Sequence, residues 1–122
     1  MTILIKNGRL INPSENLDKV MDIFVEDGII KEKAETIDRQ ADSVIDAKGC
    51  YVMPGLIDLH VHFRDPGLTY KEDIETGSKA AAKGGFTTVC CMPNTKPVVD
   101  NVETVKYIIE KGEKTGLTNV LP

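Results

Sequence analysis

The chain has 122 residues, a hydrophobic fraction of 41% and a net charge of −4 from 15 basic and 19 acidic residues. This length is ordinarily one domain, and no apolar run approaches the ~18 to 20 residues of a membrane helix. A mildly acidic chain with scattered basic residues has no field to attract nucleic acid or an acidic membrane. Three cysteines (Cys50, Cys90 and Cys91) cannot all pair within one chain, which favours structural thiols and a reducing, cytoplasmic setting.

Residues 1–54 contain short β-rich runs separated by turn dipeptides, which predicts an antiparallel β unit. Asn7-Gly8 and Asp27-Gly28 are typical hairpin turns. They predict one hairpin from Thr2–Lys6 and Arg9–Ile11, and a second from Val20–Glu26 and Ile29–Lys33. Two further short strands are expected at Ser43–Asp46 and Cys50–Met53.

Residues 55–122 have a different pattern, in which apolar strands alternate with helices. The predicted strands are Leu56–Val61, Phe86–Met92 and Asn119–Leu121, and the first should be buried on both faces. This β-α-β-α-β order indicates parallel strands with helical crossovers, in either a doubly wound sheet or a (β/α)8 barrel. A barrel needs ~250 residues, so we expect this chain to be a truncated piece with an incomplete barrel.

Two amphipathic segments between these strands predict the helices. The first is expected over Thr69–Lys83, because Thr69-x-x-Glu72 is a capping-box pattern and Gly84-Gly85 stops a helix. The second should be capped by Asp100 or Asn101 and ended by Gly112 or Gly116. Its apolar face is expected to contain Val102, Val105, Ile108 and Ile109.

The two histidines of the chain, His60 and His62, lie at the C-terminal end of the first apolar strand. Side chains at i and i+2 of a strand share one face, and active sites of β/α folds lie at this end of the strands. Neighbouring imidazoles are a natural half of a zinc site, so His60 and His62 are candidate metal ligands. The alternative is a pair of surface or core histidines without a metal, because a motif as short as His-x-His also occurs by chance.

Three polar residues near the histidines are candidate site residues. Asp58 precedes them and can hold a ligand or its backbone as an acceptor. Arg64 would share their face if the strand stayed regular, and it suggests a carboxylate-bearing substrate; otherwise it pairs with Asp65 or Asp73. Asn94 follows the second strand, where an amide can donate to a carboxylate and accept from a ring N–H, although Pro-Asn is also ordinary turn chemistry.

The stretch Val52-Met-Pro-Gly-Leu-Ile-Asp58-Leu-His60-Val-His62-Phe-Arg64-Asp-Pro-Gly67 closely resembles the amidohydrolase superfamily, and most of all its bacterial dihydroorotase family. The resemblance continues through Lys71-Glu-Asp73, Ala80–Val89 and Met92-Pro-Asn94-Thr95, and covers essentially the whole chain. It implies an α/β fold in which residues 55–122 begin a (β/α)8 barrel. Residues 1–54 would then belong to a small β-sandwich built together with a C-terminal segment.

The same resemblance implies a chemistry. One or two zinc ions would be held in part by His60 and His62, and His62, Arg64 and Asn94 would bind the substrate. The reaction would be the reversible conversion of N-carbamoyl-L-aspartate to (S)-dihydroorotate in pyrimidine biosynthesis. No general acid/base can be assigned, because the resemblance places that aspartate and the remaining metal ligands beyond Pro122. The 122-residue chain alone is therefore expected to be inactive, and exposed strand edges predict self-association or a homo-oligomer.

Two alternatives remain open. The first is a dihydropyrimidinase, hydantoinase or allantoinase, whose substrates have no ring carboxylate for Arg64 to bind. The second is a non-catalytic homologue that serves as a scaffold for a partner enzyme.

Overall fold

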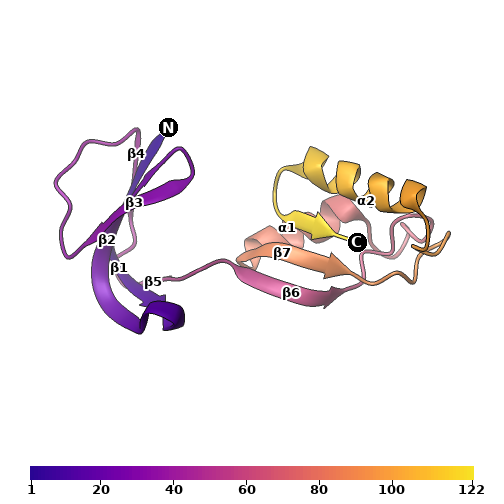
Figure 1. Cartoon of the computed structure of the whole chain (residues 1–122), viewed down its shortest axis with the longest axis horizontal. Helices are drawn as coiled ribbons and strands as arrows, with labels where there is room; N and C mark the ends of the chain where they lie inside the picture. Colours follow the sequence, from indigo (N-terminus) through magenta and orange to yellow (C-terminus); the bar gives the residue numbers. More distant parts are fainter. The chain divides into compact units, whose positions relative to one another are not determined.

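The computed structural model describes all residues, 1–122, and the chain divides into two compact units, Met1–Pro54 and Gly55–Pro122 (Figure 1). Each unit has its own sheet. No helix of the chain has both the length and the apolar character needed to cross a membrane.

The first unit is a five-stranded mixed sheet in the order β3-β2-β1-β4, with β5 also paired to β1. The β1–β2 and β2–β3 pairs are antiparallel, but β4 and β5 run parallel to β1. The prediction of a purely antiparallel unit is therefore wrong, because the chain crosses over after β3 and returns in the direction of β1. The elements are β1 (Thr2–Asn12), the 3-10 helix η1 (Pro13–Glu15), β2 (Leu17–Glu26), β3 (Ile29–Ala34), β4 (Ser43–Asp46) and β5 (Tyr51–Val52).

The predicted hairpin at Asn7-Gly8 is also wrong, because this dipeptide forms a bulge inside the continuous strand β1. Asn7 has a φ of 62°, and pairing with β2 resumes at Gly8. The buried carboxylate of Asp22 accepts the Asn7 backbone N–H at 2.9 Å, and a Cβ on Gly8 would lie 2.4 Å from a methyl carbon of Val52. Contacts with distant residues thus decide this conformation. The Asp27-Gly28 hairpin is confirmed between β2 and β3.

The second unit has the predicted β-α-β-α-β order and a parallel three-stranded sheet, β6-β7-β8. Val89 and Val120 are paired in register and pack with Phe63, Ile74 and Ile108 in one buried core. The sheet and both helices therefore share this core. The elements are β6 (Leu56–Val61), α1 (Ile74–Lys83), β7 (Phe86–Cys91), α2 (Val102–Thr115) and β8 (Asn119–Leu121).

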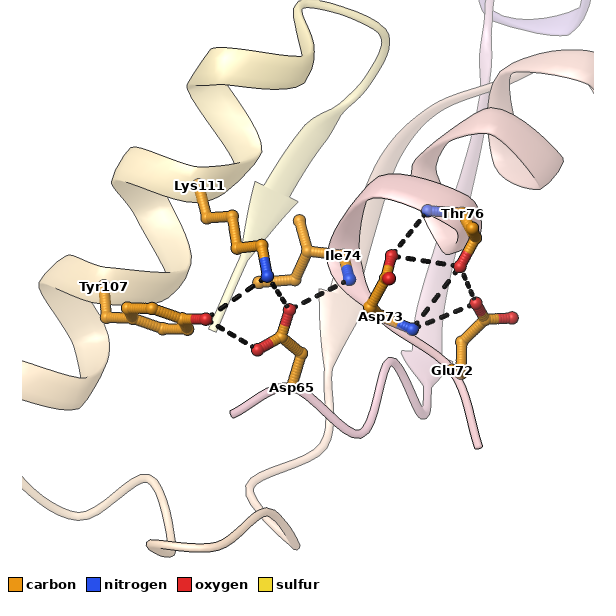
Figure 2. A network of polar contacts seen from close by, with 7 residues as sticks. All are labelled: Asp65, Glu72, Asp73, Ile74, Thr76, Tyr107 and Lys111. Atoms are coloured by element: carbon orange, nitrogen blue, oxygen red, sulfur yellow. Dashed lines mark hydrogen bonds and ion pairs between the residues drawn. The ribbon is translucent and has the colours of Figure 1, made fainter. Parts of the chain in front are cut away.

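Helix α1 begins at Ile74, five residues later than predicted from Thr69. Asp73 is the N-cap: its carboxylate accepts the Thr76 backbone N–H at 2.8 Å, and the Thr76 hydroxyl lies near the Asp73 N–H (Figure 2). The capping box thus uses Asp73 and Thr76. The predicted stop is confirmed, since α1 ends at Lys83 before Gly84.

Helix α2 is capped by Asn101 and ends at Gly116, one of the two predicted alternatives at each end. Its buried face contains Thr104, Ile108 and Gly112. The predicted face was therefore partly wrong, because Val102 is 64% exposed. Gly112 is buried instead: it lies so close to β8 that an added Cβ would be 2.7 Å from Cβ of Val120. The small size of Gly112 allows α2 to approach β8 closely.

Strand β6 was expected to be buried on both faces, and this is wrong for the present chain. Ile57 is 61% exposed and Leu59 is 71% exposed. By alternation these two side chains share one face of β6, and their exposure shows that no element of this chain covers that face. Strand β6 is also an edge strand that pairs with β7 alone.

Candidate metal and carboxylate site

The imidazoles of His60 and His62 lie side by side at the C-terminal end of β6. Their Nε2 atoms are 3.2 Å apart, and the ring planes are inclined by 66°. With Zn–N bonds of about 2.0–2.1 Å and tetrahedral angles, two nitrogen ligands of one zinc ion lie about 3.3–3.4 Å apart. The spacing of these two nitrogens therefore fits a shared metal ion.

Asn94 contacts the other nitrogen of His62, with Oδ1 at 2.9 Å from Nδ1. An amide oxygen only accepts hydrogen bonds, so this contact fits the neutral tautomer in which Nδ1 donates and Nε2 has a free lone pair. That tautomer is the one that binds a metal through Nε2. The amide nitrogen of Asn94 is left as a donor for another group.

The carboxylate of Asp58 acts on the backbone of the histidine pair. Its Oδ1 accepts the His60 backbone N–H at 3.0 Å and makes no bond to either imidazole. Since β6 has a strand on one side only, this bond satisfies a backbone donor of the edge strand and fixes the chain at His60.

Arg64 lies beyond the regular part of the strand, so the expected alternation does not extend to it. Strand β6 ends at Val61, and Arg64 has a left-handed φ of 61°. Arg64 as a whole residue is half-buried, and its guanidinium forms none of the ion pairs of the chain. The alternative partners are engaged elsewhere: Asp65 binds Lys111, and Asp73 caps α1.

Two backbone hydrogen bonds hold the loop after β6 against the loop after β7. The Met92 N–H donates to the Val61 carbonyl at 2.8 Å, and the Lys96 N–H donates to the Pro66 carbonyl at 3.0 Å. These contacts bring Asn94 to His62 although 32 residues separate them in the chain.

Sequence reasoning missed one polar cluster next to this site. The side chain of Asp65 is fully buried and binds Tyr107 and Lys111, which are 42 and 46 residues away. Their spacing of four residues places Tyr107 and Lys111 on one face of α2, but no local pattern links that face to Asp65.

The chain contains no group of three or more His, Cys, Asp or Glu side chains that could enclose a metal ion. Catalytic zinc sites have three protein ligands and one open position. The two imidazoles alone do not complete such a ligand set.

Comparison with known proteins identifies the family of this chain. Residues 49–122 match the sequence profile of the family described as "Dihydro-orotase-like". The chain belongs to the dihydro-orotase-like family. It is 53% identical over its whole length to the dihydroorotase of Pelobacter propionicus and 58% identical to that of Geobacter sulfurreducens. It spans 29% of the length of these curated relatives.

Solved structures of similar fold include the L-hydantoinase (dihydropyrimidinase) of Arthrobacter aurescens. That structure has a TM-score of 0.76 and 34% identity, and the match covers 93% of this chain and 25% of the hydantoinase. A D-hydantoinase from Thermus sp. has a TM-score of 0.71 and 36% identity, with 90% of this chain and 24% of that one covered. These hydantoinases support an amidohydrolase architecture.

Proposed function

We propose that this chain provides the first part of a dihydroorotase active site, which interconverts N-carbamoyl-L-aspartate and (S)-dihydroorotate in pyrimidine biosynthesis. The observation that carries the proposal is the arrangement of the histidine pair, with two Nε2 atoms 3.2 Å apart and Asn94 on Nδ1 of His62. The unpaired Arg64 follows two residues later.

His60 and His62 would each donate an Nε2 lone pair to a zinc ion. Zinc polarises a carbonyl oxygen and lowers the pKa of a bound water toward ~7, which makes hydroxide available at neutral pH. The remaining ligands would come from residues outside this chain, because only two imidazoles meet here. Whether one or two ions bind depends on those ligands.

Arg64 and Asn94 would hold the ring carboxylate of the substrate. A guanidinium binds a carboxylate through two parallel hydrogen bonds, and the free amide nitrogen of Asn94 can add a third. Ring opening adds water across the amide bond, breaks the C–N bond and transfers a proton to the nitrogen. The group that handles this proton is not assigned to any residue of the chain, so we expect no turnover from the 122 residues alone.

We further propose that β6-α1-β7-α2-β8 begins a (β/α)8 barrel. The strands are parallel and in sequential order, and the candidate site lies at their C-terminal ends, as in such barrels. Residues 1–54 would form part of a composite sandwich. In support, β3 and β4 carry exposed apolar side chains, such as Ile29 and Val44, that another sheet could cover. The free thiols fit a cytoplasmic setting.

A chimera tests the proposed activity, with this chain replacing the segment to which it aligns in the Geobacter sulfurreducens dihydroorotase. The chimera should open dihydroorotate, and Arg64→Met should lower kcat/KM by about 100-fold because a carboxylate loses its charged partner. Arg39→Met is the matched control, since Arg39 pairs with Glu32 in the first unit. A chimera that folds but does not hydrolyse dihydroorotate would contradict the proposal.

A hydantoinase is the second candidate, supported by the solved hydantoinases of similar fold. Hydantoin has no ring carboxylate. A hydantoinase would therefore hydrolyse hydantoin equally well with Arg64 or with Met at this position, and the same pair of chimeras separates the two functions.

A further inference from the structure

The residue after Arg64 is a carboxylate with no exposed side-chain surface. Asp65 accepts a hydrogen bond from the Tyr107 hydroxyl at 2.8 Å, an ion pair from Lys111 Nζ at 2.6 Å and the Ile74 backbone N–H at 3.3 Å (Figure 2). Burying a charge is costly unless it is paired and hydrogen-bonded. Both carboxylate oxygens of Asp65 are satisfied, so this site is built to keep it buried.

The three donors come from two helices. Ile74 is the first residue of α1, where free backbone N–H groups favour an anion, and Tyr107 and Lys111 are one turn apart on α2. Lys111 also donates to the Tyr107 hydroxyl at 3.3 Å, and the hydrogen bond to Asp65 raises the pKa of Lys111. The cluster therefore ties the loop after β6 to both helices at once.

Arg64 needs such support because its backbone is left-handed. A φ of 61° costs an arginine of the order of 1–3 kcal/mol and persists where the surroundings hold it. One hydrogen bond within the loop, from the Leu68 N–H to the Arg64 carbonyl at 2.9 Å, closes the turn. The buried side chain of Asp65 anchors the next residue.

The side chain of Arg64 differs from those of the other two arginines. Arg9 pairs with Asp18 and Arg39 pairs with Glu32, whereas Arg64 has no acidic partner. The backbone of Arg64 is thus restrained while its guanidinium remains available.

We infer that Asp65, Tyr107 and Lys111 are positioning residues that hold the Arg64 backbone in the conformation in which its side chain receives a substrate carboxylate. The carboxylate as ligand rests on the proposed function, but the restraint of the Arg64 backbone does not. Tyr107 and Lys111 lie on α2 and act through Asp65 rather than by contacting the substrate.

NMR of the uniformly ¹⁵N-labelled 122-residue chain tests the restraint without ligand. The heteronuclear NOE of the Arg64 backbone amide should fall in Tyr107→Phe and in Lys111→Met, and Lys111→Arg should restore it. Lys106→Met is the control, because Lys106 is exposed on the same helix and contacts none of these groups. The amide signals of Val89 and Ile108 report whether the core of the unit is intact.

Addition of dihydroorotate tests the ligand. Three arginines give three Nε–Hε signals, and Arg64 alone should shift, with Arg9 and Arg39 as internal references. Each of these substitutions removes a bond to Asp65 and the bond between Tyr107 and Lys111. Binding should therefore weaken at least about fivefold in Tyr107→Phe and in Lys111→Met, but not in Lys106→Met.

Two results would overturn the inference: an Arg64 amide that stays equally ordered in both variants, or loss of the Val89 and Ile108 signals in both, which would make the cluster a general stability element. Loss of order at Arg64 without any dihydroorotate-induced shift in the unmodified chain would support the positioning role. The same result would count against the proposed carboxylate ligand. Failure of the positioning role and failure of the proposed function are therefore distinguishable.

Discussion

Gly67 lies directly against the backbone of Lys96. A Cβ built on Gly67 would fall 1.8 Å from the Lys96 carbonyl oxygen, and Gly67 has a φ of +88°. No other residue type can occupy this position without moving one of the two loops that bring Asn94 to His62.

Gly67→Ala should therefore lower the free energy of unfolding by more than about 2 kcal/mol, because strain at positive φ adds to a clash with backbone. Urea unfolding monitored by circular dichroism measures the loss. Gly85→Ala is the matched control: Gly85 has a similar φ of +84° with no atom within 4 Å of the added Cβ, so it should cost about 1 kcal/mol. Equal losses in the two variants would refute the close contact.

Asn94→Ala should weaken Zn²⁺ binding by the chain about tenfold, because His62 loses the acceptor that holds its metal-binding tautomer. Competition with a chromophoric chelator measures the affinity. Asn119→Ala is the control: it removes an exposed amide from β8, away from His62, and should leave the zinc affinity unchanged. If the two variants bind zinc alike, Asn94 does not support the ligand.

Asp73 should make α1 sensitive to acid. Hydrogen bonding from the Thr76 backbone holds the pKa of Asp73 below its ordinary value of 3.8. Its ionised form thus stabilises the folded state above pH ~3.8, and this contribution is lost as the pH falls through the lowered folded-state pKa. Asp73→Asn keeps the cap without the charge, so its stability should fall less between about pH 5 and about pH 3. Thermal melting across this range measures the difference, and parallel losses in both proteins would contradict it.

The three thiols should differ in reactivity. Burial, and then the neighbouring Cys90, raises the pKa of Cys91 to about 11, whereas Cys50 is exposed. Because the thiolate is the reactive form, iodoacetamide should modify Cys50 well before Cys91. Mass spectrometry of digested peptides follows each site, and the difference should disappear in urea. Cys91 reacting as fast as Cys50 in the folded chain would show that it is not shielded.

The free edge of β6 should promote self-association. Leu59 is 71% exposed on a strand with one open side. Leu59→Lys should lower the average mass measured by light scattering, while Lys106→Met should not. A chain that is monomeric before any substitution would disprove this expectation.

The sequence by itself determined the local features of this protein. Apolar runs, glycine stops and the His-x-His spacing are encoded within a few residues, so the β-α-β-α-β order of residues 55–122, the end of α1 and the pairing of His60 with His62 followed from the sequence. The family resemblance followed as well, because its motifs are contiguous.

Only the tertiary structure decided features that depend on distant partners. Asn7-Gly8 became a bulge because Asp22 and Val52 contact it, and α1 began at Ile74 with Asp73 as its N-cap although a capping-box pattern also stood at Thr69. The same holds for the site: Asn94 reaches His62, and Asp65 is buried between α1 and α2, through contacts spanning 32 to 46 residues. Short-range sequence patterns cannot specify such contacts, because the energy of a buried hydrogen bond depends on which side chains the fold brings within reach.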